Sequence, residues 1–202
     1  MRGFAEYAPT GHCGNPLVRV ELRAPLPLVT LAPVRSVSPF SDLELNAIGV
    51  LKRRAIEARI VAPLLRAFAA EIGEARAHAI ARSVIGGIAR EQGAALARAA
   101  GGDSLAEFEG TLERWTADDA LRIEPLAADA ERLDFDVVRC RYAEMYRDLG
   151  VPELGAILSC ERDAALIEGF NAGVSLDRAQ TIMQGDSCCT FRYSLRRALP
   201  AE

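Results

Sequence analysis

The periodicity of the apolar residues changes once along this 202-residue chain, and that change constrains the fold most. Between residues 51 and 99, apolar side chains recur every three or four positions, which is typical of amphipathic helices. After Asp119 they alternate with polar residues, as in half-buried strands. Helices first and strands later predict an α+β fold rather than a regularly alternating α/β fold.

The helical half contains several proline and glycine signals. The first long helix is expected to end at Gly73, with a kink or a break and restart at Pro63. A second helix is expected over residues 74–99, where close packing should compensate the weak helix propensity of the glycines at 86–87. The pattern predicts a third helix over residues 105–115.

The second half predicts a small sheet. Residues 121–124 and 133–138 are expected to pair as an antiparallel hairpin. Beyond them the pattern predicts two short helices, over residues 142–149 and 154–166, and two more strands, over residues 174–183 and 189–195. The expected architecture is therefore α+β, with N-terminal long helices packed on a small antiparallel sheet with short helices.

Prolines are concentrated near the N-terminus, where six of the ten fall in the first 40 residues. Proline lacks an amide donor, so this segment is unsuited to a helix or a central strand. We therefore expect residues 1–40 to form an arm that lies on the body or on a partner subunit. Residues 41–200 are expected to form a single α+β domain.

Composition narrows the range of partners. The formal net charge of −4 gives no electrostatic basis for non-specific nucleic-acid binding. No run of about 18 apolar residues is present, so no membrane partner is expected, and the N-terminus lacks the apolar core of a signal peptide. We therefore expect a cytoplasmic protein. A homo-oligomer is left open, with the alanine-rich long helix as a candidate contact face.

Cysteines are the most informative side chains. Four of the five lie between Cys140 and Cys189, and all are expected to be reduced thiols. A thiolate is a strong nucleophile when a cation, a helix N-terminus or a base lowers its pKa. Their spacing contains no Cys-x-x-Cys pair, so no metal site is expected. The ordinary alternative is that each buried thiol is simply a small hydrophobic group.

Two carboxylates lie at helical spacing from these thiols. Asp163 follows Cys160 by three residues, and Glu144 follows Cys140 by four, so each pair would share a helix face. Asp163 is the preferred general base, although either carboxylate could instead be a solvated helix charge. A cysteine–histidine dyad would need one of the only two histidines, at positions 12 and 78.

An ordered set of motifs lies in the second half of the chain. The motifs are Arg139-Cys140-Arg141-Tyr142-Ala143-Glu144-Met145, Leu149-Gly150, Pro152-Glu153-Leu154-Gly155, Cys160-x-x-Asp163, Glu168-Gly169-Phe170, Leu176-x-Arg178, Thr181-Ile182-Met183-x-Gly185 and Cys189-x-Phe191-Arg192-Tyr193. With these motifs, the sequence resembles the L-2-amino-thiazoline-4-carboxylic acid hydrolase family over roughly residues 45–195, most densely over 133–193. The chain departs from the family pattern at Thr190, where aspartate is usual, and at Ala179, where threonine is common.

The resemblance implies a cofactor-independent hydrolase that acts on C–N bonds other than peptide bonds and opens a small cyclic amidine- or amide-like ring. Such a reaction needs a nucleophile, a proton carrier and an anchor for the substrate carboxylate. We assign the first role to Cys160 or Cys189, the second to Asp163, and the third to Arg178 or Arg192. Further candidate substrate-binding residues are Thr181, Cys140 and Glu144. We expect Cys160, Asp163 and Cys189 to converge in one pocket between the sheet and the helical layer.

Two other functions remain open. The ending that carries Gly185, Cys189 and Phe191 is also similar to 4-vinyl reductase-type small-molecule-binding domains, which implies a non-catalytic binder. The departure at Thr190 favours that alternative, and retention of Cys160-x-x-Asp163 favours the enzyme. A structural or assembly role, with the arm exchanged between subunits, is the third hypothesis.

Overall fold

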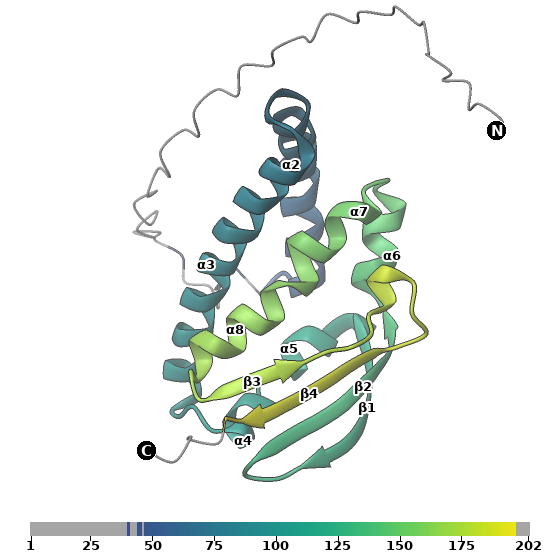
Figure 1. Ribbon diagram of the computed structural model, residues 1–202. Coiled ribbons are helices and arrows are strands. Elements are labelled where there is room, and N and C mark those ends of the chain that lie inside the picture. The colour runs from purple at the N-terminus through teal and green to yellow at the C-terminus, as the bar shows by residue number, and fades with distance from the viewer. Residues whose placement is uncertain (1–39, 41–43, 46, 197–202) are drawn as a thin grey trace, which may run out of the picture. The chain divides into compact units, whose positions relative to one another are not determined.

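The computed structural model describes residues 40, 44–45 and 47–196 (Figure 1). Apart from Phe40, the expected N-terminal arm lies outside the described residues, as does His12. Among the described residues, none of the helices combines the length and the apolar character that a membrane span requires.

Two long antiparallel helices, α2 (Val50–Ile72) and α3 (Glu74–Ala100), form the N-terminal part of the fold. Gly73 joins them with a backbone φ of 88°, a conformation that glycine adopts without a Cβ clash. Helix α2 runs through Pro63, so the break and restart considered at this position does not occur. Pro63 is exposed, and water can therefore hydrate the carbonyl that loses its amide donor.

The helix expected over residues 105–115 is divided into two short helices, α4 (Leu105–Glu109) and α5 (Glu113–Thr116). A capping box between Ser104 and Glu107 begins α4. The helix ends at Gly110, and the Thr111 hydroxyl donates to the Phe108 carbonyl at 2.7 Å. Glycine and a threonine that bonds the backbone both weaken a continuous helix, which explains the interruption.

The sheet contains four antiparallel strands in the order β1-β2-β4-β3. Their bounds are Leu121–Ala128 for β1, Arg132–Cys140 for β2, Val174–Asp177 for β3 and Cys189–Leu195 for β4. The expected hairpin of β1 and β2 is confirmed. The expected strand over 174–183 is wrong beyond Asp177, because Thr181 caps a 3₁₀ turn, η3 (Ile182–Gln184), by accepting from the Gln184 amide.

Helices cover one face of this sheet. Leu133, Phe135 and Val137 alternate along β2 and are buried against helical residues such as Phe108 of α4. The α+β fold class is thereby confirmed. In chain order, long helices precede a small antiparallel sheet, and shorter helices connect β2 to β3.

The expected helix over 154–166 has three parts. It consists of α7 (Pro152–Gly155), a π-helical turn η2 (Ala156–Cys160) and α8 (Arg162–Phe170), and it follows α6 (Arg141–Asp148). The Glu161 amide donates to the Ala156 carbonyl at 2.9 Å, which is the i→i−5 bond of a π turn. Such turns are frequent at functional sites because they redirect neighbouring side chains.

Helices α3 and α8 cross at two glycines. A Cβ on Gly93 would lie 2.0 Å from the Leu166 carbonyl oxygen, and one on Gly169 would lie 2.1 Å from the Arg90 carbonyl oxygen. Only glycine permits this backbone approach. The expectation of close packing at residues 86–87 is therefore misplaced, since a Cβ on Gly87 would meet nothing within 4 Å.

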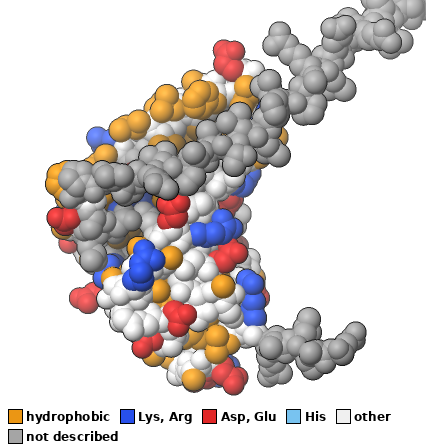
Figure 2. All heavy atoms as spheres, turned by 90° about the vertical axis from the view of Figure 1, so that its left-hand side faces the viewer, with side chains coloured by type: hydrophobic (Ala, Val, Ile, Leu, Met, Phe, Trp, Pro, Cys, Tyr) orange, Lys and Arg blue, Asp and Glu red, His pale blue; other side chains and the backbone are white. Residues whose placement is uncertain are grey.

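The long helices also carry exposed apolar side chains. Ile56, Ile60, Leu64 and Phe68 follow one another at intervals of four along α2, and each is more than half exposed. Figure 2 shows hydrophobic side chains gathered over the upper part of the viewed face, while charged side chains are more frequent below. The homo-oligomer left open from the sequence stays a prediction.

Candidate functional site

A cavity of about 90 Å³ lies between the covered face of the sheet and the helices. Its walls combine aromatic and aliphatic side chains with a small set of polar ones. The polar and thiol side chains are Arg54, Cys140, Tyr142, Ser159, Cys160, Arg162, Asp163, Arg178, Cys189 and Tyr193.

The sheet supplies a flat aromatic wall. Cys189, Phe191 and Tyr193 alternate along β4 and all face the cavity, as the period of a strand requires. The ring of Phe191 stacks on Phe135 of β2 with centroids 4.9 Å apart. A flat apolar wall of this kind suits a small planar molecule.

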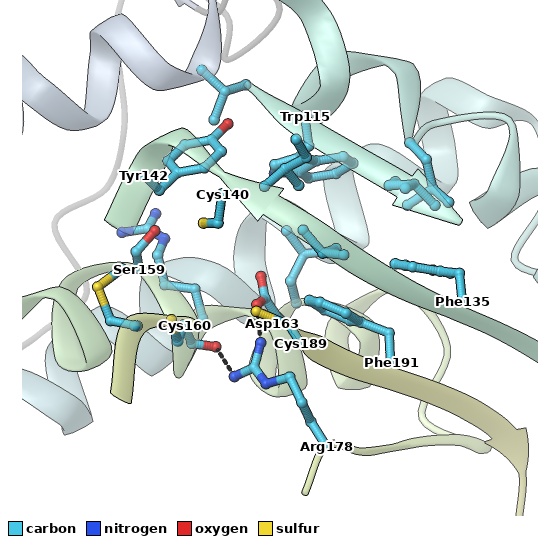
Figure 3. A pocket seen from close by; sticks show the side chains of 18 of the residues that line it. Trp115, Phe135, Cys140, Tyr142, Ser159, Cys160, Asp163, Arg178, Cys189 and Phe191 are labelled. Carbon is cyan, nitrogen blue, oxygen red and sulfur yellow. Dashed lines mark hydrogen bonds and ion pairs between the residues drawn. The ribbon is translucent and has the colours of Figure 1, made fainter. Parts of the chain in front are cut away.

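Three thiols line the cavity from different elements (Figure 3). Cys140 ends β2, Cys160 ends η2 and Cys189 begins β4. Burial raises the pKa of Cys140 to about 11 and also raises the pKa of Cys160 and of Cys189. The free cavity therefore favours neutral thiols.

Cys189 has the most support for a thiolate. The Ile182 amide donates to its sulfur at 3.2 Å. This bond and the nearby Arg178 guanidinium both act to lower the pKa of Cys189, against the larger effect of burial. Its neighbour Cys188 precedes β4 and does not line the cavity.

Asp163 and Arg178 form an ion pair at the cavity wall. Arg178 Nη1 donates to Asp163 Oδ2 at 2.5 Å, and Nη2 donates to the Cys160 carbonyl at 2.7 Å. The guanidinium also lies over the Phe191 ring, 5.0 Å from its centroid. Burial raises the pKa of the Asp163 carboxyl, and Arg178 opposes that rise. A carboxylate with a raised pKa is well suited to accept a proton.

A second charged cluster, the α2–α8 arginine cluster (Arg54, Glu57 and Arg162), is one that the sequence analysis did not single out. Arg54 Nη1 donates to Glu57 Oε2 at 2.5 Å, and Arg162 Nη2 donates to Gln92 Oε1 at 2.8 Å. Arg54 and Arg162 are both buried and both line the cavity. Arg54 lies four residues before buried Ala58, so a charge within an apolar helix stripe was the available signal.

Two buried polar atoms on the cavity wall have no hydrogen-bond partner among the described residues. They are Nε of Arg162 and the hydroxyl of Tyr142, and each residue is only 5% exposed. Burial lowers the pKa of Arg162 to about 10, and the positive charge of Arg54 acts in the same direction. Buried polar groups are normally hydrogen-bonded, so both atoms lack the partner that burial ordinarily requires.

Three sequence-predicted residues lie away from the cavity. Glu144 accepts from Arg139 Nε at 3.1 Å, and its side chain is 44% exposed. Arg192 points to the other face of the sheet and donates to Asp136 Oδ1 at 2.7 Å. Thr181 is buried, and its hydroxyl donates to Gln184 Oε1 at 3.0 Å. None of the three lines the cavity, whereas Cys140, Cys160, Asp163, Arg178 and Cys189 do.

The two departures from the family pattern also lie outside the cavity. Thr190 shares the outer face of β4 with Arg192, and its hydroxyl accepts from the Gln180 amide at 3.2 Å. Ala179 is exposed in the segment after β3. The cavity wall is therefore unchanged by either departure.

The described part of the chain contains no arrangement of residues suited to metal binding or to a cysteine–histidine dyad at the cavity. No group of three or more His, Cys, Asp or Glu side chains there could hold a metal ion. His78 lies on α3 beside Glu74, at 3.8 Å, and does not line the cavity.

Comparison with known proteins identifies the family. The model of the L-2-amino-thiazoline-4-carboxylic acid hydrolase family matches residues 53–193, which is well over half of the chain. The chain belongs to this family. The match includes every residue that lines the cavity except Val50. The resemblance found in the motifs is thereby confirmed.

Solved structures and curated proteins do not refine this family assignment. The phenol-responsive sensory domain of the transcription activator PoxR, in its crystal structure with phenol, is 14% identical in sequence to this chain. The similarity covers 70% of this chain and 74% of that domain, with a TM-score of 0.45. No curated protein matches the chain in sequence.

Proposed function

We propose that this chain is a hydrolase that opens a small cyclic C–N ring bearing a carboxylate, as the family name describes, with a cysteine nucleophile. The observation that carries the proposal is the convergence of Cys189, Cys160 and the Asp163–Arg178 pair on one cavity. These side chains come from β4, η2, α8 and the segment after β3, and they supply a nucleophile and a proton carrier to one small volume.

Cys189 is the preferred nucleophile among the three cavity thiols. The Ile182 amide and the Arg178 guanidinium both act to lower its pKa, whereas Cys140 has support from the amides of Tyr142 and Ala143 but from no cation. Asp163 raises and Arg178 lowers the pKa of both Cys160 and Cys189, so the Ile182 amide is what distinguishes Cys189 from Cys160. Stabilisation of developing negative charge by a positioned N–H favours attack by Cys189.

The reaction adds one water across the ring C–N bond. The Cys189 sulfur bonds to the ring C=N carbon, its proton passes to Asp163, and the electron pair of the double bond moves onto the ring nitrogen. Asp163 returns the proton to this nitrogen. The exocyclic amino group on the same carbon gives a second proton through Asp163, so the ring nitrogen leaves as an amine while the carbon forms a C=NH bond and stays bound to sulfur. Water then adds to this carbon and displaces the sulfur; one water proton returns to the thiol, the other goes to the C=NH nitrogen, and the ring-opened carbamoyl product is released.

A second candidate function is ligand binding without turnover. One observation favours it: burial raises the pKa of all three cavity thiols, so none is an activated thiolate in the free protein. In this alternative the cavity holds a small planar molecule, and the thiols are part of its wall.

Mass spectrometry on 2-aminothiazoline-4-carboxylate separates the two functions. The hydrolase converts it into a product heavier by one water, and Cys189→Ser lowers the rate at least about 100-fold. Cys188→Ser is the matched control, since this adjacent thiol lies off the cavity, and it keeps the wild-type rate. Full activity of Cys189→Ser would end the role of this thiol. Binding of the compound without ring opening would support the second function.

A further inference from the structure

Arg162 is a buried cation without a carboxylate partner among the described residues. Its Nη2 bonds the neutral side-chain amide of Gln92 at 2.8 Å, and its Nε has no partner there. The residue is 5% exposed and lines the cavity. A guanidinium removed from water is costly unless an anion or other acceptors compensate it.

The surrounding charges do not compensate Arg162. Two carboxylates lie near it, and both already accept from other arginines: Glu57 accepts from Arg54 Nη1 at 2.5 Å, and Asp163 accepts from Arg178 Nη1 at 2.5 Å. Within the α2–α8 arginine cluster, Arg54 and Arg162 thus share the influence of one carboxylate, Glu57. Tyr146 of α6, also close to Arg162, has its pKa raised by burial to about 12 and stays neutral. This end of the cavity therefore has an excess of positive charge.

The other arginines are less suited to an anionic ligand. Arg178 already directs its two terminal nitrogens to Asp163 and to the Cys160 carbonyl. Arg192 lies on the opposite face of the sheet, where it pairs with Asp136. Among the cations that line the cavity, Arg162 retains a free donor that is buried and has no partner in the described part of the chain.

We propose that Arg162, with Arg54 beside it, is the anion subsite of the cavity and binds the carboxylate of the ligand. This inference rests on the proposed function, since it assumes that a small cyclic molecule occupies the cavity. Arg162 and Asp163 are consecutive on α8 and both line the cavity, so one small molecule can contact both. The Tyr142 hydroxyl is a second unpartnered group, which gives the ring of the ligand a neutral hydrogen-bond partner.

The subsite makes the cavity selective for an anion over an isosteric neutral molecule. Titration calorimetry with 2-aminothiazole-4-carboxylate, whose aromatic ring resists opening, and with its carboxamide measures this selectivity. We expect wild-type protein to bind the acid about 10- to 100-fold more tightly than the amide, the range of a charge-assisted hydrogen bond. Arg162→Gln is expected to lower the affinity for the acid to that for the amide.

Arg90→Gln is the matched control. Arg90 also joins α3 to α8, through Glu168 at 2.7 Å, but its pair is exposed and lies off the cavity. This variant is expected to bind both probes as the wild type does. Thermal unfolding gives a second measurement: the acid raises the melting temperature of wild type and Arg90→Gln, but not that of Arg162→Gln.

Equal affinity of wild type for acid and amide, or no binding of either, overturns the subsite whether or not Arg162→Gln folds. Retention of acid selectivity by folded Arg162→Gln also overturns it. Arg162-dependent binding of the acid, without ring opening of 2-aminothiazoline-4-carboxylate, leaves the subsite standing and removes the hydrolase. Ring opening without a preference for the acid over the amide leaves the hydrolase standing and removes the subsite.

Discussion

Two charged ends of the same cavity differ in how their charges are balanced. At one end, Arg178 is paired with Asp163 and a backbone carbonyl. At the other end, Arg54 and Arg162 share the influence of one carboxylate, Glu57, and Arg162 has a donor without a partner among the described residues. The first end is internally complete, and the second is completed by an anion from outside.

This difference assigns separate tasks to two similar side chains. A guanidinium held by two acceptors is fixed in place and can orient a carboxylate and stabilise a thiolate, which suits Arg178 to positioning. A buried guanidinium with a free donor gains stability from a bound anion, which suits Arg162 to recognition. Proton transfer and substrate recognition are thereby placed at different walls of one small volume.

The largest effect is expected from removing the carboxylate of the Asp163–Arg178 ion pair. Asp163→Asn removes the proton acceptor and leaves Arg178 without its carboxylate. We expect ring opening to fall at least about 100-fold and the free energy of unfolding to fall by about 2–3 kcal/mol. Arg162→Gln, at the unbalanced end, is expected to change the free energy of unfolding by less than about 1 kcal/mol. Urea denaturation measures both.

Asp136→Asn is the control for this comparison. It breaks an aspartate–arginine pair with Arg192 that has a similar length, 2.7 Å, but lies on the outer face of the sheet. Its expected cost is under about 1 kcal/mol, with no loss of ring opening. A loss of stability in Arg162→Gln as large as that in Asp163→Asn would contradict the proposed difference between the two ends.

An effect confined to alkaline pH concerns Cys140, on the wall between the strands and α6. Its pKa is about 11 in the folded chain and ordinarily 9.0, so the unfolded chain loses this proton first as the pH rises. Its contribution to stability is complete below pH 9 and is lost as the pH rises towards 11. The free energy of unfolding should fall by about 2–3 kcal/mol over that range.

Cys140→Ala should remove that part of the pH dependence, and Cys188→Ala should retain it. Urea denaturation at pH 8 and at higher values gives the difference between the two variants. Equal pH profiles for both variants would show that the thiol of Cys140 is not held neutral by burial.

Local patterns predicted most of the fold but only part of the site. The period-two alternation around Phe135 and Phe191 predicted strands and their buried face, and the thiols at 140, 160 and 189 marked three points on the cavity wall. The division of residues 154–166 into α7, a π turn and α8 could not be read from apolar periodicity, because one i→i−5 bond at Glu161 leaves the spacing nearly unchanged.

The arginine cluster could not be predicted from the sequence for a different reason. Arg54 and Arg162 are more than 100 residues apart, and their proximity depends on how α2 and α8 pack. From the sequence, Arg178 or Arg192 was expected to bind the substrate carboxylate, and strand alternation places Arg192 on the other face of the sheet. Pairing among distant charges is a tertiary property, so the balance at each end of the cavity emerges only from the folded chain.

A crystal structure of the protein with 2-aminothiazole-4-carboxylate tests the central claim most directly. The claim is that one cavity holds a small cyclic carboxylate between a recognition end and a reactive end. We predict that the carboxylate lies within hydrogen-bond distance of Arg162 and that the ring lies against Phe191, beside the Cys189 sulfur. A carboxylate bound to Arg178 or Arg192, or a molecule bound outside the cavity, would contradict the account.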